Sequence, residues 1–112
     1  AGTPMETAEQ SRVIYTGAHR HLIAEEISAR GTIDETMMPP REIVQRALQL
    51  GASGLILAHN HPSGSPEPSE ADVRLTRELL RTCSGLKIGI LDHIIVARPG
   101  CFSMNEHGYL ST

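Results

Sequence analysis

A ten-residue segment near the middle of the chain, His59–Pro68, most restricts what this sequence can fold into. It contains three prolines and one glycine, and a proline within a helix or a central strand removes a backbone hydrogen bond. We therefore predict irregular structure here, between an apolar run of strand length, Leu55–Ala58, and a helix that begins near Ser69. Ser69 and Asp72 have the spacing of a capping box, with aspartate in place of the usual glutamate or glutamine.

Hydrophobic periodicity on both sides of this segment predicts alternating strands and helices. In chain order, we expect strands at 12–15 and 22–28, a helix at 39–50, a strand at 55–58, a helix at 69–83, and strands at 87–96 and 102–105. The first helix is expected to end at Gly51 and to bury an apolar stripe, namely Ile43, Val44, Ala47, Leu48 and Leu50. This order is typical of an α/β domain with one mixed sheet and few helices. The 112 residues fit a single domain at 11–112, preceded at 1–10 by a disordered tail or cloning remnant.

Composition argues against several classes of function. The net charge is −3, from ten basic and 13 acidic residues, whereas nucleic-acid-binding domains are usually basic. One Phe, two Tyr and no Trp leave few rings for stacking on bases. No apolar run approaches the roughly 18 residues of a membrane span. Cys83 and Cys101 share no motif with each other, and we expect two reduced thiols in a cytoplasmic protein.

Three residues around the proline-rich segment have the chemistry of a metal site. His59 and His61 are two residues apart, so if the preceding strand geometry continues, both imidazoles project to the same side. Asp72 is expected in the first turn of the next helix, and the intervening loop can bring its carboxylate back to the imidazoles. Two histidines and one carboxylate leave a fourth tetrahedral position for water, as in catalytic zinc sites.

A hydrolase built on such a site also needs a general base and a group that stabilises an oxyanion. Glu25 and Glu26 are both candidates for the base, but neighbours on a strand point to opposite faces, so only one can face the site. The Ser69 hydroxyl could donate a hydrogen bond to the developing oxyanion. Helix capping alone also explains Ser69 and Asp72, and we expect capping to compete with these functional roles.

The other histidines have simpler interpretations. His19 and His21 repeat the spacing of the metal candidates, but no proline follows them and no aspartate lies at a useful distance, so we place them in a solvated turn. His93 is interpreted as a buried, hydrogen-bonded histidine, with support of the metal ligands as the alternative. His107, near the C-terminus, is expected to be solvated.

The joint pattern resembles a known motif. His-x-His, seven residues, Ser, two residues and Asp is the JAMM motif of the JAB/MPN metallopeptidase superfamily, and every specified position is filled, by His59, His61, Ser69 and Asp72. The sequence around the motif resembles the bacterial RadC branch over roughly residues 12–110. The segments that carry this second resemblance are Pro40–Glu42, Leu57–Gly64, Pro68–Asp72 and Leu91–Val96.

The resemblance implies the MPN, cytidine-deaminase-like α/β fold, a mixed sheet flanked by helices. It implies zinc bound by His59, His61 and Asp72, with Glu26 as the acid/base (Glu25 being the alternative) and Ser69 stabilising the tetrahedral intermediate. Superfamily members with an intact motif cleave amide or isopeptide bonds, typically in ubiquitin-like conjugates, so a protein or peptide substrate is expected.

Two other functions remain open at this point. RadC-type chains carry the label of DNA repair proteins, which leaves a DNA-processing factor or metal-dependent nuclease as an alternative. They often have an N-terminal helix-hairpin-helix region, which we do not find in this sequence, so we expect no strong nucleic-acid binding from this fragment. The second alternative is a non-catalytic interaction module that keeps the fold.

Overall fold

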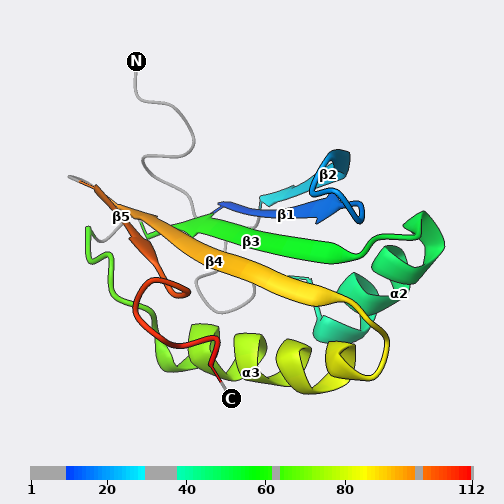
Figure 1. The fold of residues 1–112 in the computed structure, drawn as a ribbon. Coiled ribbons are helices and arrows are strands. Elements are labelled where there is room, and N and C mark those ends of the chain that lie inside the picture. The colour runs from blue at the N-terminus through cyan, green and yellow to red at the C-terminus, as the bar shows by residue number, and fades with distance from the viewer. Residues whose placement is uncertain (1–9, 30–37, 62–63, 98–99, 112) are drawn as a thin grey trace.

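The computed structural model describes residues 10–29, 38–61, 64–97 and 100–111. Within these residues the chain forms five strands and two helices, in the order that the sequence predicts (Figure 1). They are β1 (Gln10–Thr16), β2 (Leu22–Ala29), α2 (Pro40–Leu50), β3 (Gly54–Asn60), α3 (Glu70–Ser84), β4 (Gly89–Ala97) and β5 (Gly100–Ser103).

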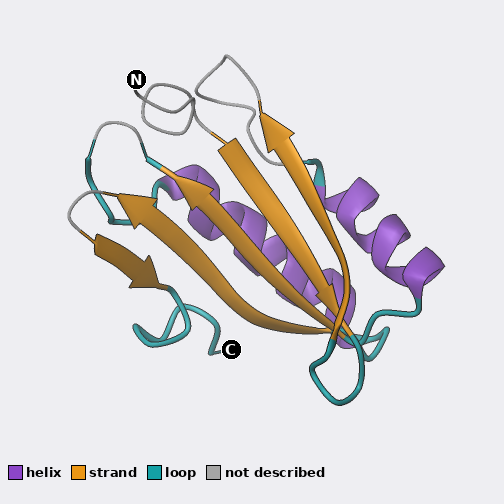
Figure 2. Ribbon diagram, turned by 90° about the horizontal axis from the view of Figure 1, so that it is seen from above, coloured by secondary structure: helices purple, strands orange, loops and turns teal. Residues whose placement is uncertain are grey.

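The strands form one sheet in the order β2-β1-β3-β4-β5. Strands β3 and β4 are parallel, and the other neighbouring pairs are antiparallel, so the sheet is mixed as predicted. A parallel pair needs a crossover connection, which α3 supplies. Figures 1 and 2 show α2 and α3 packed on the same side of the sheet. This two-layer α/β arrangement confirms the predicted fold class.

The core lies between the two helices and one face of the sheet. Alternate residues of β1 and β3, including Val13, Leu55 and Leu57, are buried there against both helices. The helices contribute buried residues that include Ile43 and Leu79. The neighbouring residues on the strands point to the other face of the sheet.

Local signals explain where α2 begins and ends. Pro40 is its first residue, where a missing N–H costs nothing, and Gly51 ends it with a left-handed φ of 66°. Ile43, Val44 and Ala47 are buried as predicted. Leu48 is 54% exposed, so its place in the predicted stripe is wrong. At about 100° per residue it lies about 140° around the helix from Ile43, outside the buried face.

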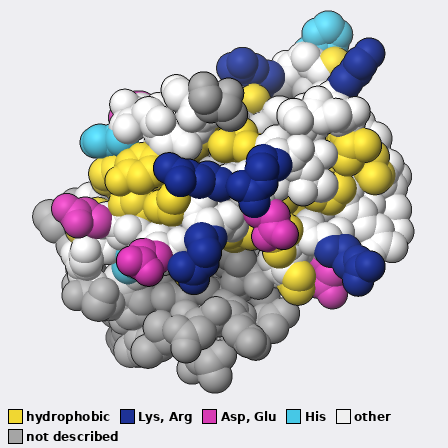
Figure 3. Space-filling view, turned by 90° about the horizontal axis from the view of Figure 1, so that it is seen from below, with side chains coloured by type: hydrophobic (Ala, Val, Ile, Leu, Met, Phe, Trp, Pro, Cys, Tyr) yellow, Lys and Arg dark blue, Asp and Glu magenta, His cyan; other side chains and the backbone are white. Residues whose placement is uncertain are grey.

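Helix α3 begins with the predicted capping box. The Ser69 side chain accepts from the backbone N–H of Asp72, and the Asp72 side chain accepts from the backbone N–H of Ser69. The outer face of the helix is polar and includes the exposed Arg74, Arg77 and Arg81. Figure 3, which views the molecule from below, shows Lys and Arg side chains across this side. The helix is therefore amphipathic, with its apolar stripe on the sheet.

The departure from the predicted elements that matters most for the candidate ligands is the end of β3. Irregular structure was expected from His59, but the strand continues through His59 and Asn60. Both residues still have partners on the neighbouring strands, and the backbone N–H of Gln10 donates to the Asn60 side chain at 2.6 Å. Proline first interrupts the sequence at Pro62, so the ladder can extend beyond the apolar run.

Departures of similar size occur at other strand ends. Gln10 belongs to β1 rather than to the predicted tail, and residues 1–9 lie outside the described residues. Strand β4 begins at Gly89, two residues later than predicted, because Lys87 has a left-handed φ of 58° that a strand does not allow. Strand β5 covers 100–103 rather than 102–105.

Two further expectations concern membranes and thiols. None of the helices in the described part of the chain is long and apolar enough to cross a membrane. Cys83 is buried and Cys101 is exposed, and both are free thiols, as predicted.

A substitution at Gly54 can test how closely β1 and β3 approach each other. A Cβ added at Gly54 would lie 2.5 Å from Thr16 Oγ1 and 3.1 Å from Leu91 Cδ1. We expect Gly54→Ala to lower the free energy of unfolding by about 1–3 kcal/mol, measured by urea denaturation. Gly85→Ala is the matched control, because a Cβ there meets nothing within 4 Å and the change should be neutral or stabilise by about 0.4–1 kcal/mol. Equal stabilities of the two variants would contradict the close approach.

Candidate metal centre

The end of β3 and the first turn of α3 together position three possible ligands. His59 is paired within the sheet, and the backbone N–H of His61 donates to the carbonyl of Val96 at 2.9 Å, so the extended geometry continues. Both imidazoles consequently project toward Asp72. His59 Nε2 lies 3.1 Å from Asp72 Oδ1, and His61 Nε2 lies 3.3 Å from Asp72 Oδ2. The two Nε2 atoms are 2.8 Å apart.

These distances fit the donor set of a small divalent cation. Two ligand atoms at about 2.0–2.1 Å from a tetrahedral zinc ion are about 3.3–3.4 Å apart. The two distances to Asp72 end on different oxygens, and with one ligand atom from each residue all three atoms lie within 4.8 Å of one another. The cluster of His59, His61 and Asp72 could therefore hold a metal ion. The His59 side chain is 2% exposed, whereas those of His61 and Asp72 are 13% and 11% exposed. Solvent thus reaches the cluster from the side of the latter two residues.

Asp72 serves the helix and the cluster together, contrary to the competition expected from the sequence. Its Oδ2 accepts from the backbone N–H of Ser69 at 2.8 Å, while Oδ1 faces His59. A carboxylate has about four lone-pair positions, so one contact does not displace the other. Burial raises the pKa of Asp72. The contact with His59 and the hydrogen bond from the Ser69 N–H together outweigh burial and hold the pKa of Asp72 well below its usual value. Asp72 is therefore ionised at neutral pH, as a metal ligand must be.

A backbone carbonyl sets the orientation of the His61 ring. Its Nδ1 lies 2.9 Å from the carbonyl oxygen of Ser65, in the loop before α3. A carbonyl can only accept, so Nδ1 carries the proton and donates. In the neutral ring Nε2 then keeps its lone pair, which points to the cluster. Pro62 and Ser63, of the same loop, lie outside the described residues.

His59 is supported by a second histidine from β4. His59 Nδ1 lies 3.0 Å from His93 Nε2, and His93 Nδ1 lies 2.7 Å from Thr76 Oγ1. His93 is completely buried, and this burial lowers the pKa of His93 to about 4. The predicted buried, hydrogen-bonded histidine is confirmed, and its partner is one of the three cluster residues.

The register of the sheet separates the two glutamates. Glu26 lies opposite Val13, which in turn lies opposite Leu57, so Glu26 faces the helix-covered side that His59 also faces. Glu25 points to the other side, where its carboxylate lies 3.1 Å from Arg12. Of the two, the structure therefore places Glu26 on the face of the candidate centre.

The carboxylate of Glu26 has partners of its own. It accepts from the Tyr15 hydroxyl and from Arg46 Nε, each at 2.8 Å. Burial raises the pKa of Glu26, but the bonds from Arg46 and Tyr15 together lower it more. The β2 residue level with His59 is Ser28, and β1 separates β2 from β3, so Glu26 lies across β1 from β3 and one further pleat repeat, about 7 Å, along β2 from the level of His59. Its role at the cluster remains a prediction.

Ser69 keeps a proton to donate. Its Oγ accepts from the backbone N–H of Asp72 at 3.1 Å, which uses an acceptor position of the hydroxyl and not its O–H. The residue is exposed at the N-terminus of α3. Capping therefore does not exclude the predicted hydrogen bond from Ser69 to a substrate oxygen.

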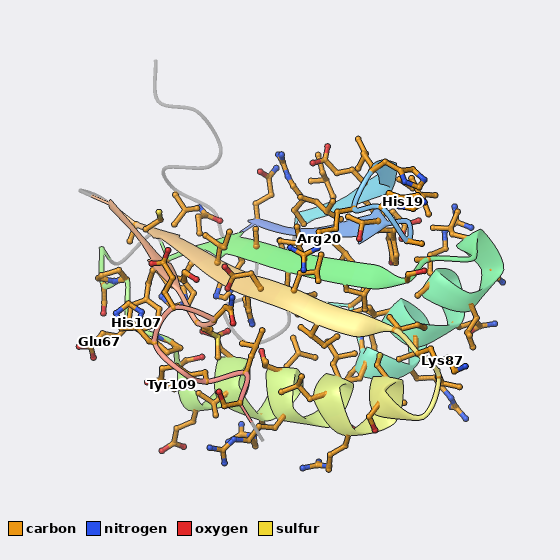
Figure 4. The ribbon with its side chains drawn as sticks, viewed as in Figure 1. His19, Arg20, Glu67, Lys87, His107 and Tyr109 are labelled. Carbon is orange, nitrogen blue, oxygen red and sulfur yellow. The ribbon has the colours of Figure 1, made fainter. Side chains whose placement is uncertain are left out.

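The remaining histidines lie away from the cluster or are exposed. His19 and His21 are exposed at the turn between β1 and β2, as predicted. Figure 4 shows His19 at the opposite end of the molecule from Glu67, which belongs to the loop before α3. His107 is exposed and stacks on Phe102 with ring centroids 3.9 Å apart.

Several contributors were not found from the sequence. Thr76 had a usable signal, because it is four residues after Asp72 and thus on the same face of α3. Tyr15 and Arg46, the partners of Glu26, come from different elements and gave no local signal. Met104, whose Sδ lies 3.9 Å from Thr76 Oγ1, could only be found from the tertiary structure.

Comparison with known families agrees with the geometry. The model of the RadC-like JAB domain family matches residues 3–109 of this chain. The chain therefore belongs to that family, and the resemblance found in its motifs is confirmed.

The cluster makes a direct prediction for metal content. Purified protein loaded with zinc and dialysed should retain one ion per chain, measured by inductively coupled plasma mass spectrometry. His59→Ala and Asp72→Ala should each lose it, because each removes one of three ligands. His19→Ala, from the other His-x-His pair, is the control and should bind as wild type. Unchanged zinc content in both cluster variants would contradict the site.

Proposed function

We propose that this RadC-like JAB domain is a zinc-dependent hydrolase that cleaves an amide or isopeptide bond in a protein or peptide. The observation that carries the proposal is the convergence of two imidazole Nε2 atoms and an ionised carboxylate at one partly open point. Zinc is favoured because two histidines and one carboxylate form a recurrent catalytic zinc set with one position left for water.

The residues of the chain supply the rest of the reaction. Zinc, when bound, would act as a Lewis acid and lower the pKa of a water molecule to about 7. In the proposal, Glu26 would accept a proton from that water as the water oxygen bonds to the carbonyl carbon, and would deliver the proton to the leaving nitrogen as the carbon–nitrogen bond breaks. Its carboxylate is kept ionised by Arg46 and Tyr15, and two bonds leave lone-pair positions free. The Ser69 hydroxyl would donate a hydrogen bond to the carbonyl oxygen on which negative charge develops.

The activity can be tested without knowing the substrate. Zinc-loaded protein is incubated with a pool of tryptic peptides and with a branched peptide in which a glycine is linked to a lysine ε-amine, and products are found by mass spectrometry. We expect cleavage that disappears in His59→Ala. Single- and double-stranded DNA form a parallel arm. Zinc-dependent DNA cleavage without peptide cleavage would favour the nuclease alternative, and no cleavage in either arm would favour a non-catalytic module.

The general base is tested by neighbouring substitutions. Glu26→Gln keeps the size of the side chain but cannot accept a proton, so kcat should fall by about 10²–10⁴-fold while zinc content stays at one per chain. Glu25→Gln is the matched control and should leave kcat unchanged, because Glu25 points to the other face of the sheet. The reverse result would show that Glu25 is the base.

The hydroxyl of Ser69 can be separated from its capping role. Glycine at an N-cap costs only a few tenths of a kcal/mol, whereas alanine costs about 0.5–2 kcal/mol. Ser69→Gly should therefore keep most of the stability yet lower kcat by about 10²–10³-fold, as expected for loss of an oxyanion donor. Thermal unfolding and steady-state kinetics measure the two effects. Full activity in Ser69→Gly would limit Ser69 to capping.

A further inference from the structure

A buried chain of polar contacts runs from the candidate metal centre to the C-terminal turn. It links His59 Nδ1 to His93 Nε2 at 3.0 Å, His93 Nδ1 to Thr76 Oγ1 at 2.7 Å, and Thr76 Oγ1 to Met104 Sδ at 3.9 Å. His93, Thr76 and Met104 are completely buried. Met104, the last residue in this series of contacts, is held to the sheet, because its backbone N–H donates to the carbonyl of His93 at 3.0 Å.

The last contact gives the chain a direction. A thioether sulfur has no proton, so in this contact the Thr76 hydroxyl donates and Met104 accepts. Thr76 Oγ1 is then free to accept from Nδ1–H of His93. A neutral His93 with its proton on Nδ1 has a lone pair on Nε2, which can accept from Nδ1–H of His59. His59 then has an unprotonated Nε2, and this atom faces His61 and Asp72.

The opposite direction is incompatible with a cation. If His93 donated from Nε2, the His59 proton would lie on Nε2, where it would occupy the position that a metal ion needs. Thr76 would then donate to His93 and lose its contact with Met104. Histidine ligands usually donate their second ring N–H to a fixed partner, which sets the tautomer and the ring orientation.

We infer that His93 and Thr76 are positioning residues. His93 Nε2 accepts a hydrogen bond from Nδ1–H of His59, Thr76 Oγ1 accepts one from Nδ1–H of His93, and this order keeps His59 Nε2 available to a divalent cation. This inference rests on the metal centre of the proposed function but not on hydrolysis. It assigns a role to two buried residues that contact neither the cation nor a substrate.

The test is the zinc affinity of conservative pairs of variants, measured by competition with a chromogenic chelator. Thr76→Val is nearly isosteric but removes the acceptor for His93, and His93→Leu removes the acceptor for His59. Both should weaken zinc binding by about 10–100-fold. Thr76→Ser and His93→Gln keep an acceptor oxygen and should recover most of the affinity. If these two residues had only a packing role, Thr76→Ser and His93→Gln would not recover zinc affinity.

Thr16→Val is the matched control. Thr16 is a buried threonine at the far end of β1 from Ser11, the residue that pairs with His59. Among the described residues, the Thr16 Oγ1 has no hydrogen-bond partner. The same substitution there should leave zinc affinity unchanged. Circular dichroism shows which variants fold. If His93→Leu does not fold, the Thr76→Val and Thr76→Ser pair decides.

A second measurement uses the zinc-loaded wild-type protein. Nitrogen-15 spectra should show a protonated Nδ1 of His59 with scalar coupling across the hydrogen bond to Nε2 of His93. Wild-type affinity in both Thr76→Val and a folded His93→Leu, or a His59 Nδ1 proton without that coupling, would overturn the inference and leave the hydrolase proposal standing. Absence of zinc binding by the wild-type protein would overturn both.

Discussion

The carboxylate of Asp72 joins the first turn of α3 to the end of β3, and the geometry of the candidate centre depends on this junction. An ionised carboxylate is costly to bury unless hydrogen bonds or opposite charges compensate for lost water. Here the Ser69 N–H and the positive end of the α3 dipole face the same group that faces His59 and His61. A shift of the helix along the sheet would therefore disturb its cap and the metal ligands together.

The register of the sheet determines what else can approach that junction. Strand β1 lies between β2 and β3, so each of its inward residues aligns one residue on either side. Val13 aligns Glu26 on β2 with Leu57 on β3. Glu26 is therefore on the same face of the sheet as His59, which is two residues after Leu57. The ion pair with Arg46 keeps Glu26 charged but also weakens it as a base, because its pKa is lowered. A cation at the cluster would lower the pKa of a bound water to about 7, which reduces the free-energy cost of proton transfer to such a group but does not remove it.

Much of this arrangement could be predicted from local sequence signals. Pro40 and Gly51 delimit α2, Ser69 and Asp72 form the capping box of α3, and the His-x-His pair comes directly after a buried apolar run. These signals are short-range, since each depends on backbone geometry within a few residues. The motif as a whole also indicated the family correctly.

The features that could not be predicted depend on pairing between distant segments. Strand β3 extends to Asn60 because residues of β1 and β4 continue to pair with it. Strict alternation shows that Glu25 and Glu26 point to opposite faces of the sheet, but only the register with β1 shows which of them shares the face of His59. The partner of His93 is 34 residues away in the sequence, and no local rule specifies which ring nitrogen it contacts.

The charge of the ligand set gives a physical reason for combining a helix cap with a buried histidine chain. The cap keeps Asp72 anionic, while the contact of His61 with Ser65 and the inferred bond from His59 to His93 place a proton on Nδ1 of each ring, so that a neutral ring has its lone pair on Nε2. Two neutral imidazoles and one carboxylate carry a single negative charge, so a divalent cation held by them retains one net positive charge. In a largely buried site that charge is screened less than in water and acts strongly on a nearby water or carbonyl oxygen. A second carboxylate would cancel it, and a protonated His59 would repel the cation, so the cap and the inferred proton order of the buried chain together favour binding of a divalent cation that keeps one net positive charge.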